Sequence, residues 1–442
     1  MNSYPVRIAL IAALGGFLFG FETAVISGAE KTIQQLWSLS DFWQGFTVAS
    51  SLIGTVIGSM IAGFPARKYG RKKVLSVIAI LYLLSAIGCA SIPVWALFVF
   101  FRFTGGIAVG ASSVVGPMYI SEISPARLRG RLAGSFQLNI VAGIFIAYLT
   151  NYFFSKMGGD ASWRWMLGIM VLPAGLFWLL LRSIPESPRW LILNGRDAEA
   201  IPIMQRLGET DTNKAIDDIR RSVAEHRESL FQKRYAKPIL YAVLLAMFNQ
   251  LSGINAIIYY SPRIFAIAGF DKAHSFLQPI YIGGFNLLFT LLAMPVIDKF
   301  GRKTLLLIGS VGMIAFLALT AHALNSTTAN SSVLIYLIGF IAFFAFSQGA
   351  VIWVFISEIF PNTVRSQGGS LGSFTHWIMA MAISWIFPSI AAIVNGKIHT
   401  GVVYSFYFFA AMMLLHLLFV WRVMPETKGK SLEQIQQELG IK

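Results

Sequence analysis

Polar side chains interrupt an apolar stretch of the chain, residues 240–260, that is long enough to cross a bilayer. The stretch carries Asn249, Gln250 and Asn255 near its middle and the pair Tyr259–Tyr260 at its end. Amides in hydrocarbon are costly unless they find partners, but they can donate to and accept from hydroxyl groups, while aromatic rings cover C–H faces. The stretch alone therefore fits two interpretations: a site for a neutral polyol, or hydrogen bonds that join membrane helices.

Two residues that weaken helices lie beside this polar patch. Gly253 falls between the amides, and Pro262 follows the tyrosines directly. Glycine loses backbone entropy in a helix, and proline removes a backbone hydrogen bond. We therefore expect the helix to be weak on both sides of the patch.

Glu22 is a second candidate for chemistry, because it lies in an apolar segment near residues 8–28. An ionised carboxylate at membrane depth costs at least ~2.5 kcal/mol without a partner. Arg102, in another apolar segment, is the obvious partner. The alternative is a permanent ion pair between two helices, but membrane carboxylates are functional by default, which favours proton coupling.

The composition is that of a polytopic membrane protein. Of 442 residues, 56% are hydrophobic and 12% are charged, whereas soluble domains carry about 25% charged residues. The net charge of +15 lies in short loops between apolar segments, so we expect no nucleic-acid partner. The one cysteine, Cys89, lies in an apolar segment and permits no internal disulfide.

Several function classes lack their sequence signatures. Apart from His376, the histidines are scattered singly without metal-ligand spacing, and no phosphate-binding loop or selectivity-filter repeat is present. We therefore expect neither an enzyme, an ATP-driven pump nor a channel, and no cofactor or metal.

The apolar segments predict an all-α membrane protein with twelve transmembrane helices. At about twenty residues each, they fall near residues 8–28, 45–65, 74–93, 97–119, 132–153, 164–183, 239–260, 277–297, 304–324, 334–356, 370–392 and 402–422.

One polar stretch divides these segments into two sets of six. The stretch contains two short amphipathic helical patterns, at residues 196–208 and 212–230. We therefore expect an N-terminal six-helix bundle over residues 1–185 and a helical linker over residues 186–237. A C-terminal six-helix bundle over residues 238–424 and a tail over residues 425–442 follow.

Basic residues in the loops predict the orientation. They gather at residues 67–73, 127–131, 298–303, in the central stretch and in the tail, all on one side, whereas the opposite loop at 325–333 has none. The positive-inside rule then places both termini and the central stretch in the cytosol.

The two halves repeat three motifs in the same order. YGRKK recurs as FGRKT, YISEISPARLRG as FISEIFPNTVRS, and PESPRW as PETKGK. The offsets are similar, roughly 230 to 240 residues, which indicates a duplicated membrane protein with a site near the midplane between its halves.

These residues resemble the sugar porter family of the major facilitator superfamily. The resemblance covers nearly the whole chain and is carried by GFETAVISGA (20–29), YGRKK (69–73), FRFTGGIAVG (101–110), PMYISEISPARLRG (117–130), PESPRWL (185–191), NQLSGINAIIYYSP (249–262), IDKFGRK (297–303), ISEIFPNTVRSQG (356–368) and PETKGKSLEQ (425–434). It implies the major facilitator fold and alternating access for a monosaccharide.

The resemblance also implies roles for individual residues. It assigns an outer gate to Tyr259 and Tyr260. It also pairs Glu22 with Arg102. At the Glu22 position, proton-coupled members of the family usually have Asp and passive facilitators have Asn. The polar and aromatic residues expected near the midplane are Gln137, Asn249, Gln250, Asn255, Asn286, Gly349, Trp353, His376 and Trp377. Of these, the resemblance assigns sugar contacts to Gln137, Gln250, Asn255, Asn286, Trp353 and Trp377. Phe19 matches an aromatic residue that lines the pocket in the family.

Three positions depart from the family pattern. Asn249 replaces a usual Gln, His376 replaces an Asn or Gln, and Arg67 replaces an acid or amide. The pair His376–Trp377 resembles animal fructose facilitators, whereas Trp353 resembles glucose and xylose carriers. The substrate can therefore be glucose, fructose, xylose or galactose, and His376 can contact the sugar or bond as a neutral imidazole to a neighbour.

Charged residues gather at the cytosolic ends of the expected spans. Cross-half pairs among them could latch the cytosolic side, or they could serve stability and orientation alone. The set is Arg71, Glu122, Arg129, Glu186, Arg189, Arg302, Glu358, Arg365 and Glu426.

Our interpretation is a sugar–proton symporter in which Glu22 gains a proton and releases Arg102. The alternatives are a passive sugar uniporter and a sugar sensor with a transporter fold, although the tail after Pro425 is short for a sensor. We expect a monomer in a lipid bilayer, in a bacterial inner membrane.

Overall fold

The computed structural model describes most of the chain. The described residues are 3–125, 128–159, 161–209, 211–221, 228–325, 332–361, 363–395, 399–428, 430 and 432–441. The statements below concern these residues.

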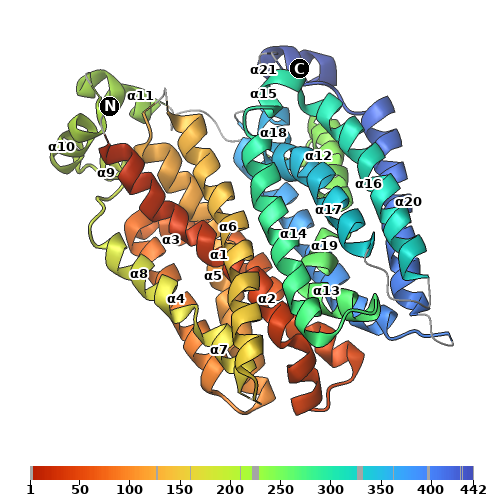
Figure 1. The fold of residues 1–442 in the computed structure, drawn as a ribbon. Coiled ribbons are helices and arrows are strands. Elements are labelled where there is room, and N and C mark those ends of the chain that lie inside the picture. The colour runs from red at the N-terminus through yellow and green to blue at the C-terminus, as the bar shows by residue number, and fades with distance from the viewer. Residues whose placement is uncertain are drawn as a thin grey trace. The chain divides into compact units, whose positions relative to one another are not determined.

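The described chain is built from helices (Figure 1). They are α1 (Tyr4–Leu36), α2 (Asp41–Ile61), α3 (Gly63–Tyr69), α4 (Arg71–Ser91), α5 (Trp95–Ile123), α6 (Arg129–Met157), α7 (Ser162–Gly168), α8 (Val171–Leu181), α9 (Pro188–Leu193), α10 (Asp197–Leu207), α11 (Thr212–Arg221), the 3-10 turn η1 (Lys233–Tyr235), α12 (Ala236–Leu251), α13 (Ile254–Ile267), α14 (Lys272–Ala293), α15 (Ile297–Phe300), α16 (Arg302–Leu324), α17 (Ser332–Phe346), α18 (Gln348–Ile359), α19 (Arg365–Ala391), α20 (Thr400–Arg422) and α21 (Leu432–Leu439).

The prediction of twelve membrane-spanning segments is confirmed. Among the described residues, twelve helical segments are long and apolar enough to cross a membrane, and each overlaps one expected span. The largest shift of a single boundary is in the first segment, where α1 runs eight residues beyond the expected end, to Leu36. By contrast, α14 ends at Ala293, before the expected limit of 297. Met294 keeps helical angles, but Pro295 after it has no backbone N–H to continue the helical hydrogen bonds.

The expected weak points beside the polar patch are present. Gly253 has φ +84° and separates α12 from α13, a left-handed conformation that glycine adopts without steric cost. Further along, Tyr260 has non-helical angles of φ −120° and ψ 18°, two residues before Pro262. The seventh span is therefore two helices with a further distortion, and its backbone turns where its polar side chains lie.

A break in the tenth span was missed by the sequence analysis. Ser347, with φ −116° and ψ −94°, separates α17 from α18. The signal was a short polar run, Ser347–Gln348–Gly349, inside an apolar segment. Serine favours local backbone hydrogen bonds, and here its hydroxyl donates to the carbonyl of Phe343 at 2.5 Å.

The chain packs as two compact units. The first contains Met1–Thr23, Ile53–Ile144 and Arg164–Arg227, and the second contains Ala24–Leu52, Phe145–Trp163 and Glu228–Lys442. The units thus do not follow the two halves of the sequence, because parts of α1, α2 and α6 pack in the second unit. The division at residues 185 and 238 stays a prediction about how the bundles move.

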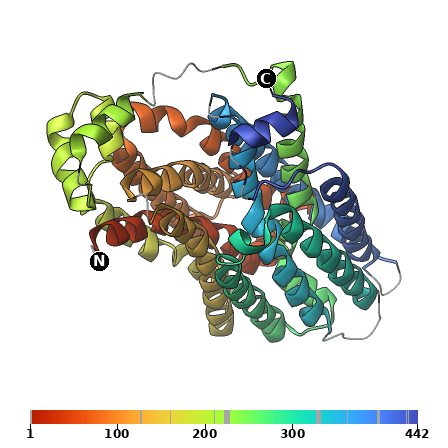
Figure 2. The ribbon, with the colours of Figure 1, turned by 90° about the horizontal axis from the view of Figure 1, so that it is seen from above.

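Neighbouring helices within each unit pack along their lengths. In the first unit α4 packs on α5 and on α8, and in the second α16 packs between α17 and α20 (Figures 1 and 2). Small residues permit close approach, as at Gly312 of α16, where an added methyl group would collide with the Phe343 ring of α17.

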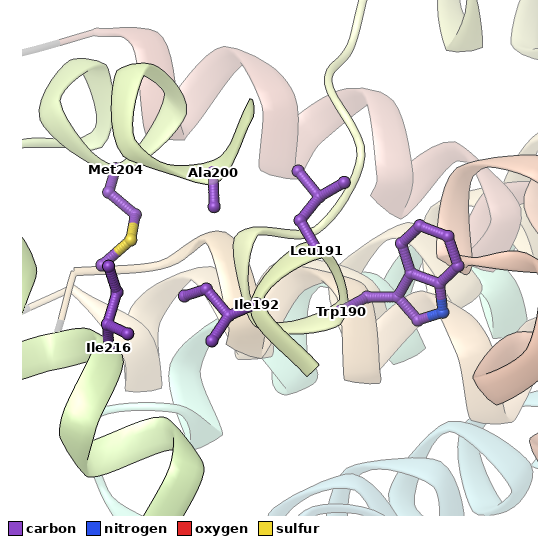
Figure 3. Close-up of a cluster of buried hydrophobic side chains, with 6 residues drawn as sticks. All are labelled: Trp190, Leu191, Ile192, Ala200, Met204 and Ile216. Atoms are coloured by element: carbon purple, nitrogen blue, oxygen red, sulfur yellow. The ribbon is translucent and has the colours of Figure 1, made fainter. Parts of the chain in front are cut away.

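The helical linker has its own small apolar core within the first unit. The side chains of Ile192, Met204 and Ile216, from α9, α10 and α11, point toward one another (Figure 3). The same cluster includes Trp190, Leu191 and Ala200. The amphipathic patterns at 196–208 and 212–230 are confirmed for α10 and α11, and residues 222–227 lie outside the described part of the chain.

Replacing Gly253 by alanine tests the break in the seventh span. The new methyl group would enter a left-handed conformation and meet the ring of Phe409, so we expect a loss of about 1–3 kcal/mol in unfolding free energy. The measurement is thermal unfolding of the purified protein in detergent. Gly63→Ala, at a helical position where nothing lies within 4 Å, is the control and should be neutral or stabilising; equal melting temperatures for Gly253→Ala and the parent protein would contradict the assignment.

Candidate functional site

Glu22 and Arg102 form a buried ion pair inside the first unit. Glu22 lies on α1 and Arg102 on α5, and Nη1 of Arg102 donates to Oε1 of Glu22. The two residues are 2% and 1% exposed. The structure thus pairs the residues that the sequence singled out, and each charge has the other as its partner at membrane depth.

The groups around this pair are closely packed, and several of their polar atoms have no hydrogen-bond partner among the described residues. On α5, a methyl group added at Gly105 would lie 2.9 Å from Oε1 of Glu22, so only glycine leaves room for the carboxylate. The Nε and Nη2 groups of Arg102 make no hydrogen bond to any described residue, and neither do the buried hydroxyls of Tyr82 and Ser85 on α4. Arg102 therefore holds Glu22 through one N–H, although a guanidinium can form two parallel bonds to a carboxylate.

A second polar cluster, in the second unit, is centred on Gln250. Its Oε1 accepts a hydrogen bond from Asn255 Nδ2 at 2.7 Å, and its Nε2 donates to Asn249 Oδ1 at 3.1 Å. All three side chains are less than 9% exposed. Because Gly253 turns the chain between α12 and α13, the amides before and after the break face one another.

His376 of α19 completes this amide cluster. Gln250 Nε2 lies 3.0 Å from Nε2 of the imidazole, which fits a neutral ring whose nitrogen accepts the amide hydrogen. The ring lies 5.0 Å from the Trp353 ring and 4.8 Å from the Trp377 ring, between centroids. Of the two interpretations of His376, the described contacts match an imidazole bonded to a neighbour; contact with a sugar stays a prediction.

The remaining expected sugar residues are distributed over both units. Asn286 is buried in α14, and Gly349 lies at the start of α18 beside the Ser347 break. Phe19 and Gln137 are half-buried and belong to the first unit. The structure therefore brings together Asn249, Gln250, Asn255, His376, Trp353 and Trp377, while the roles of the other residues stay predictions.

The tyrosine pair is buried against α19. Tyr260 donates its hydroxyl hydrogen to the carbonyl of Ser384 at 2.7 Å, and its ring stacks on Phe387 with centroids 5.2 Å apart. Tyr259 is 2% exposed. A gate role for these residues stays a prediction; Tyr260 itself has the non-helical angles that distort α13.

The charged set forms the same arrangement in each half of the sequence. In the first half Arg71 binds Glu122 through two bonds, Nε to Oε2 at 2.9 Å and Nη2 to Oε1 at 2.8 Å. In the second half Arg302 Nη2 binds Glu358 Oε1 at 2.8 Å. These contacts join residues of one half, so a latch between halves stays a prediction.

A second carboxylate caps the helix that begins with each arginine. Glu186 accepts from the backbone N–H of Arg71 at 2.9 Å, at the start of α4. Glu426 accepts from the backbone N–H groups of Arg302 and Lys303, both at 2.9 Å, at the start of α16. The first amides of a helix have no partner inside the helix and favour negative charge, so each acid stabilises its helix terminus.

The sequence analysis missed a hydroxyl in each arrangement. Ser187 Oγ donates to Glu122, and Thr427 Oγ1 donates to Glu358, each at 2.6 Å. The signal was available, because Ser187 and Thr427 both follow the proline–glutamate step of the repeated motif. The duplication therefore preserves a unit of four residues: one arginine, two acids and one hydroxyl.

The other members of the charged set lie nearby in sequence. Arg365 begins α19, and its Nε donates to the carbonyl of Phe360 at 3.4 Å. Arg189 is half-buried at the start of α9. Arg129 begins α6, and its side chain lies outside the described part of the structure. At the departure position Arg67, the described contact is made by the backbone, whose carbonyl accepts from Trp190 Nε1 at 2.7 Å.

The described residues contain twelve helical segments long and apolar enough to cross a membrane, and the sequence repeats charged motifs at their ends. Together with the buried polar clusters, these features define a polytopic membrane transporter of the major facilitator fold. The chain belongs to the sugar transporter family, whose model, described as "Sugar (and other) transporter", matches residues 8–439. This family membership confirms the sequence interpretation of a transporter rather than an enzyme.

Relatives with assigned names are similar over nearly their whole length. The D-xylose-proton symporter of Escherichia coli (strain K12) is 35% identical over 475 residues, which cover 98% of this chain and 96% of that protein. The arabinose-proton symporter of Bacillus subtilis (strain 168) is 36% identical over 445 residues, covering 98% and 95%. The glucose transport protein of Synechocystis sp. is 37% identical over 461 residues, covering 98% and 97%.

Solved structures show the same fold. The inward open conformation of the xylose transporter XylE from E. coli matches with a TM-score of 0.87 at 33% identity, covering 98% of this chain and 100% of that one. The proton:xylose symporter XylE bound to 6-bromo-6-deoxy-D-glucose matches with a TM-score of 0.83 at 34% identity, covering 99% and 100%.

The cap at Glu426 predicts a pH-dependent contribution to stability. Burial alone would raise the pKa of Glu426, but hydrogen bonds from the backbone amides of Lys428, Arg302, Lys303 and Thr427 outweigh burial and lower its pKa below 4.5. A carboxylate with a lowered folded-state pKa stabilises the fold above its unfolded pKa, and this stabilisation is lost as the pH falls through the folded pKa.

Glu426→Gln should therefore destabilise the protein at pH 7 by about 0.5–2 kcal/mol, the range for a lost helix cap. The difference from the parent protein should shrink once the pH falls below the ordinary value of 4.5. Thermal unfolding in detergent across this pH range is the measurement. Glu209→Gln, at an exposed position, is the control; a difference that is unchanged at low pH would exclude ionised Glu426 as the cap.

Proposed function

We propose that this protein is a symporter that moves a monosaccharide and a proton together by alternating access, with Glu22 as the proton acceptor. The observation that carries the proposal is the buried Glu22–Arg102 pair within the membrane-spanning helices α1 and α5. The relatives named as D-xylose-proton and arabinose-proton symporters support it.

The geometry of the pair supports a step in which a proton replaces the arginine. Arg102 holds Glu22 by one N–H, and both groups are almost fully buried. When Glu22 gains a proton its charge disappears, and the attraction that joins α1 to α5 at this point falls sharply. Arg102 is then free to find other acceptors, and the helices that carry the pair can move apart.

The amide cluster supplies groups suited to sugar hydroxyls. Asn249, Gln250 and Asn255 bond to one another, so a sugar can exchange these bonds for bonds to its own hydroxyls without leaving buried amides unpaired. Trp353 and Trp377 can cover the C–H faces of the ring. The proposal also includes sugar contacts for Gln137, a place for Phe19 in the lining of the pocket, rocking of the bundles 1–185 and 238–424 during transport, and an outer gate formed by Tyr259 and Tyr260.

The proposal limits the substrate to a small neutral sugar. The cluster contains amides, an imidazole and indole rings but no charged group among the described contacts, which suits uncharged hydroxyls. Glucose, fructose, xylose and galactose remain the candidates from the chain itself. Relatives named for D-xylose, arabinose and glucose support the same class.

The proposal includes an orientation and a cellular location. Basic residues before α4 and α16 and in the linker support a cytosolic position for both termini, for residues 186–237 and for the arginine–glutamate units. In this proposal those units form the cytosolic gate. We propose a monomer in a bacterial inner membrane; relatives from bacteria support the bacterial membrane.

Glu22→Gln tests the coupling step. The variant cannot ionise at this position, so it should exchange labelled sugar across a proteoliposome membrane but fail to concentrate it when a proton gradient is imposed. Glu199→Gln, at an exposed position on α10, is the matched control and should accumulate sugar as the parent does. Uphill accumulation by Glu22→Gln would leave a passive uniporter with a structural ion pair as the better interpretation.

Asn255→Ala tests the sugar site. Loss of one buried amide that bonds to Gln250 removes a hydroxyl partner and leaves Gln250 short of a donor, so sugar binding should weaken roughly 10- to 100-fold. Tryptophan fluorescence of the purified protein, titrated with several sugars, measures this change. Asn213→Ala, at an exposed position on α11, should bind as the parent does; unchanged affinity in Asn255→Ala would place the site elsewhere.

A further inference from the structure

A second buried carboxylate lies on α1, and the mechanism above does not use it. Glu30 follows Glu22 by two helical turns, belongs to the second unit and is 1% exposed. The sequence analysis passed over it, because the first span was expected to end near residue 28, whereas α1 continues to Leu36. A carboxylate so deeply buried requires partners.

Glu30 is held first by the neighbouring helix α2. Gln44 Nε2 donates to the carbonyl of Glu30 at 2.5 Å and lies 3.2 Å from Oε2 of the same residue. Gln44 is itself fully buried. These bonds join α1 to α2, two helices of the first half of the sequence, and leave the negative charge without a bonded cation.

The cation facing Glu30 comes from the second half of the sequence. Arg263 of α13 has Nη1 at 3.9 Å from Glu30 Oε2 and Nη2 at 3.8 Å from Asp41 Oδ1. Its Nη2 also donates to Gln34 Oε1 at 2.7 Å, and Gln34 Nε2 donates to Asp41 at 2.8 Å. The guanidinium therefore lies among oxygen atoms from α1 and from the start of α2.

This contact is attractive but loose. At 3.9 Å the Arg263–Glu30 pair is beyond hydrogen-bond distance, and Nη1 makes no hydrogen bond to any described residue. By contrast, Arg71 and Glu122 bond through two N–H groups at 2.8 and 2.9 Å. Among the described contacts, Arg263 makes one hydrogen bond to α1, to Gln34 Oε1, and is otherwise attracted to Glu30 and Asp41 by charge. The contact can therefore separate without breaking several hydrogen bonds.

The surrounding packing shows that Arg263 lies at a contact between the two halves. Tyr148 of α6 donates to the carbonyl of Ile258 on α13 at 2.8 Å and lies 3.3 Å from Ser261 Oγ. Phe46 of α2 lies 5.1 Å from the Trp385 ring of α19, between centroids. All of these residues belong to the second unit, so first-half segments close against α13 and α19 beside the tyrosine pair.

We propose that Glu30, Gln34, Asp41, Gln44 and Arg263 form an outer latch that holds α1 and α2 against α13 and must open for sugar to enter from outside. This inference rests on the proposed transport function, in which the side away from the arginine–glutamate units faces outward. Glu30 and Arg263 are positioning residues: they touch no substrate and act by setting how long the outer side stays closed.

Cysteine labelling tests the latch in the full chain, reconstituted in proteoliposomes. Ser261→Cys, in a Cys89→Ser background, places a thiol where Tyr148 packs on α13, a position 1% exposed when the latch is closed. A membrane-impermeant maleimide is added to the outer face or the inner face in separate samples. Glu30→Gln and Arg263→Gln, singly and together, are compared with the parent.

If Glu30 and Arg263 hold the latch closed together, each single variant should accelerate labelling from the outer face about threefold or more. The double variant should label little faster than either single variant, because each change removes the same interaction. Arg263→Lys keeps the charge and should label nearer the parent rate. Lys272→Gln removes an exposed positive charge close by and should not change labelling. Elution as a single monodisperse species checks that each variant is folded.

Three results would overturn the latch: unchanged labelling in all variants, fully additive effects of the two substitutions, or acceleration from the inner face. The assay needs neither sugar nor a proton gradient. If the parent protein fails to accumulate sugar, the proposed function fails while labelling can still show a latch; if labelling fails while sugar accumulates, the latch alone is wrong.

Discussion

A charge in hydrocarbon must have a partner, and the Glu22–Arg102 pair satisfies this constraint with a single hydrogen bond between two fully buried groups. The pair is stable only while both members are charged. A proton that neutralises Glu22 leaves the Arg102 charge buried without a counter-charge. This destabilises the arrangement in which the two residues are paired and favours a change of conformation. The glycine at 105, which leaves room beside the carboxylate, shows that the fold accommodates this pair closely. In the proposed mechanism, coupling follows from the cost of burying one charge without its partner.

The same constraint explains why the helices break where they do. A continuous helix through residues 240–267 would place Gln250 and Asn255 on different faces, whereas the turn at Gly253 lets Asn255 bond to Gln250 at 2.7 Å. Next to the break at Ser347, the backbone carbonyl of Gln348 accepts a hydrogen bond from Asn249 at 3.4 Å. Irregular backbone and polar side chains therefore satisfy one another inside the membrane-spanning segments, as polar groups that do not face water must at membrane depth. Both breaks lie where a polar ligand could compete for the same bonds.

Sequence patterns predicted the parts of the structure that depend on composition or on repetition. Twelve spans follow from apolar length, and the Arg71 and Arg302 units follow from a duplicated motif. The Glu22–Arg102 pair could be predicted because charges inside spans are rare. What could not be predicted depends on three-dimensional packing. The break at Ser347 has only a short polar signal in the sequence. Glu30 was expected to lie in a loop, because a span of about twenty residues ends near residue 28, whereas α1 continues to Leu36. Its partner Arg263 is more than 200 positions away, and no repeat joins the two.

The central claim is that sugar entry consumes a proton from the outer side through Glu22. The most direct measurement is the pH of a lightly buffered medium around proteoliposomes or cells when a transported sugar is added, recorded together with uptake of the labelled sugar. The account predicts that the medium becomes more alkaline in step with sugar entry, and that Glu22→Gln abolishes the pH change. Sugar entry at the same rate with no change in external pH would contradict it.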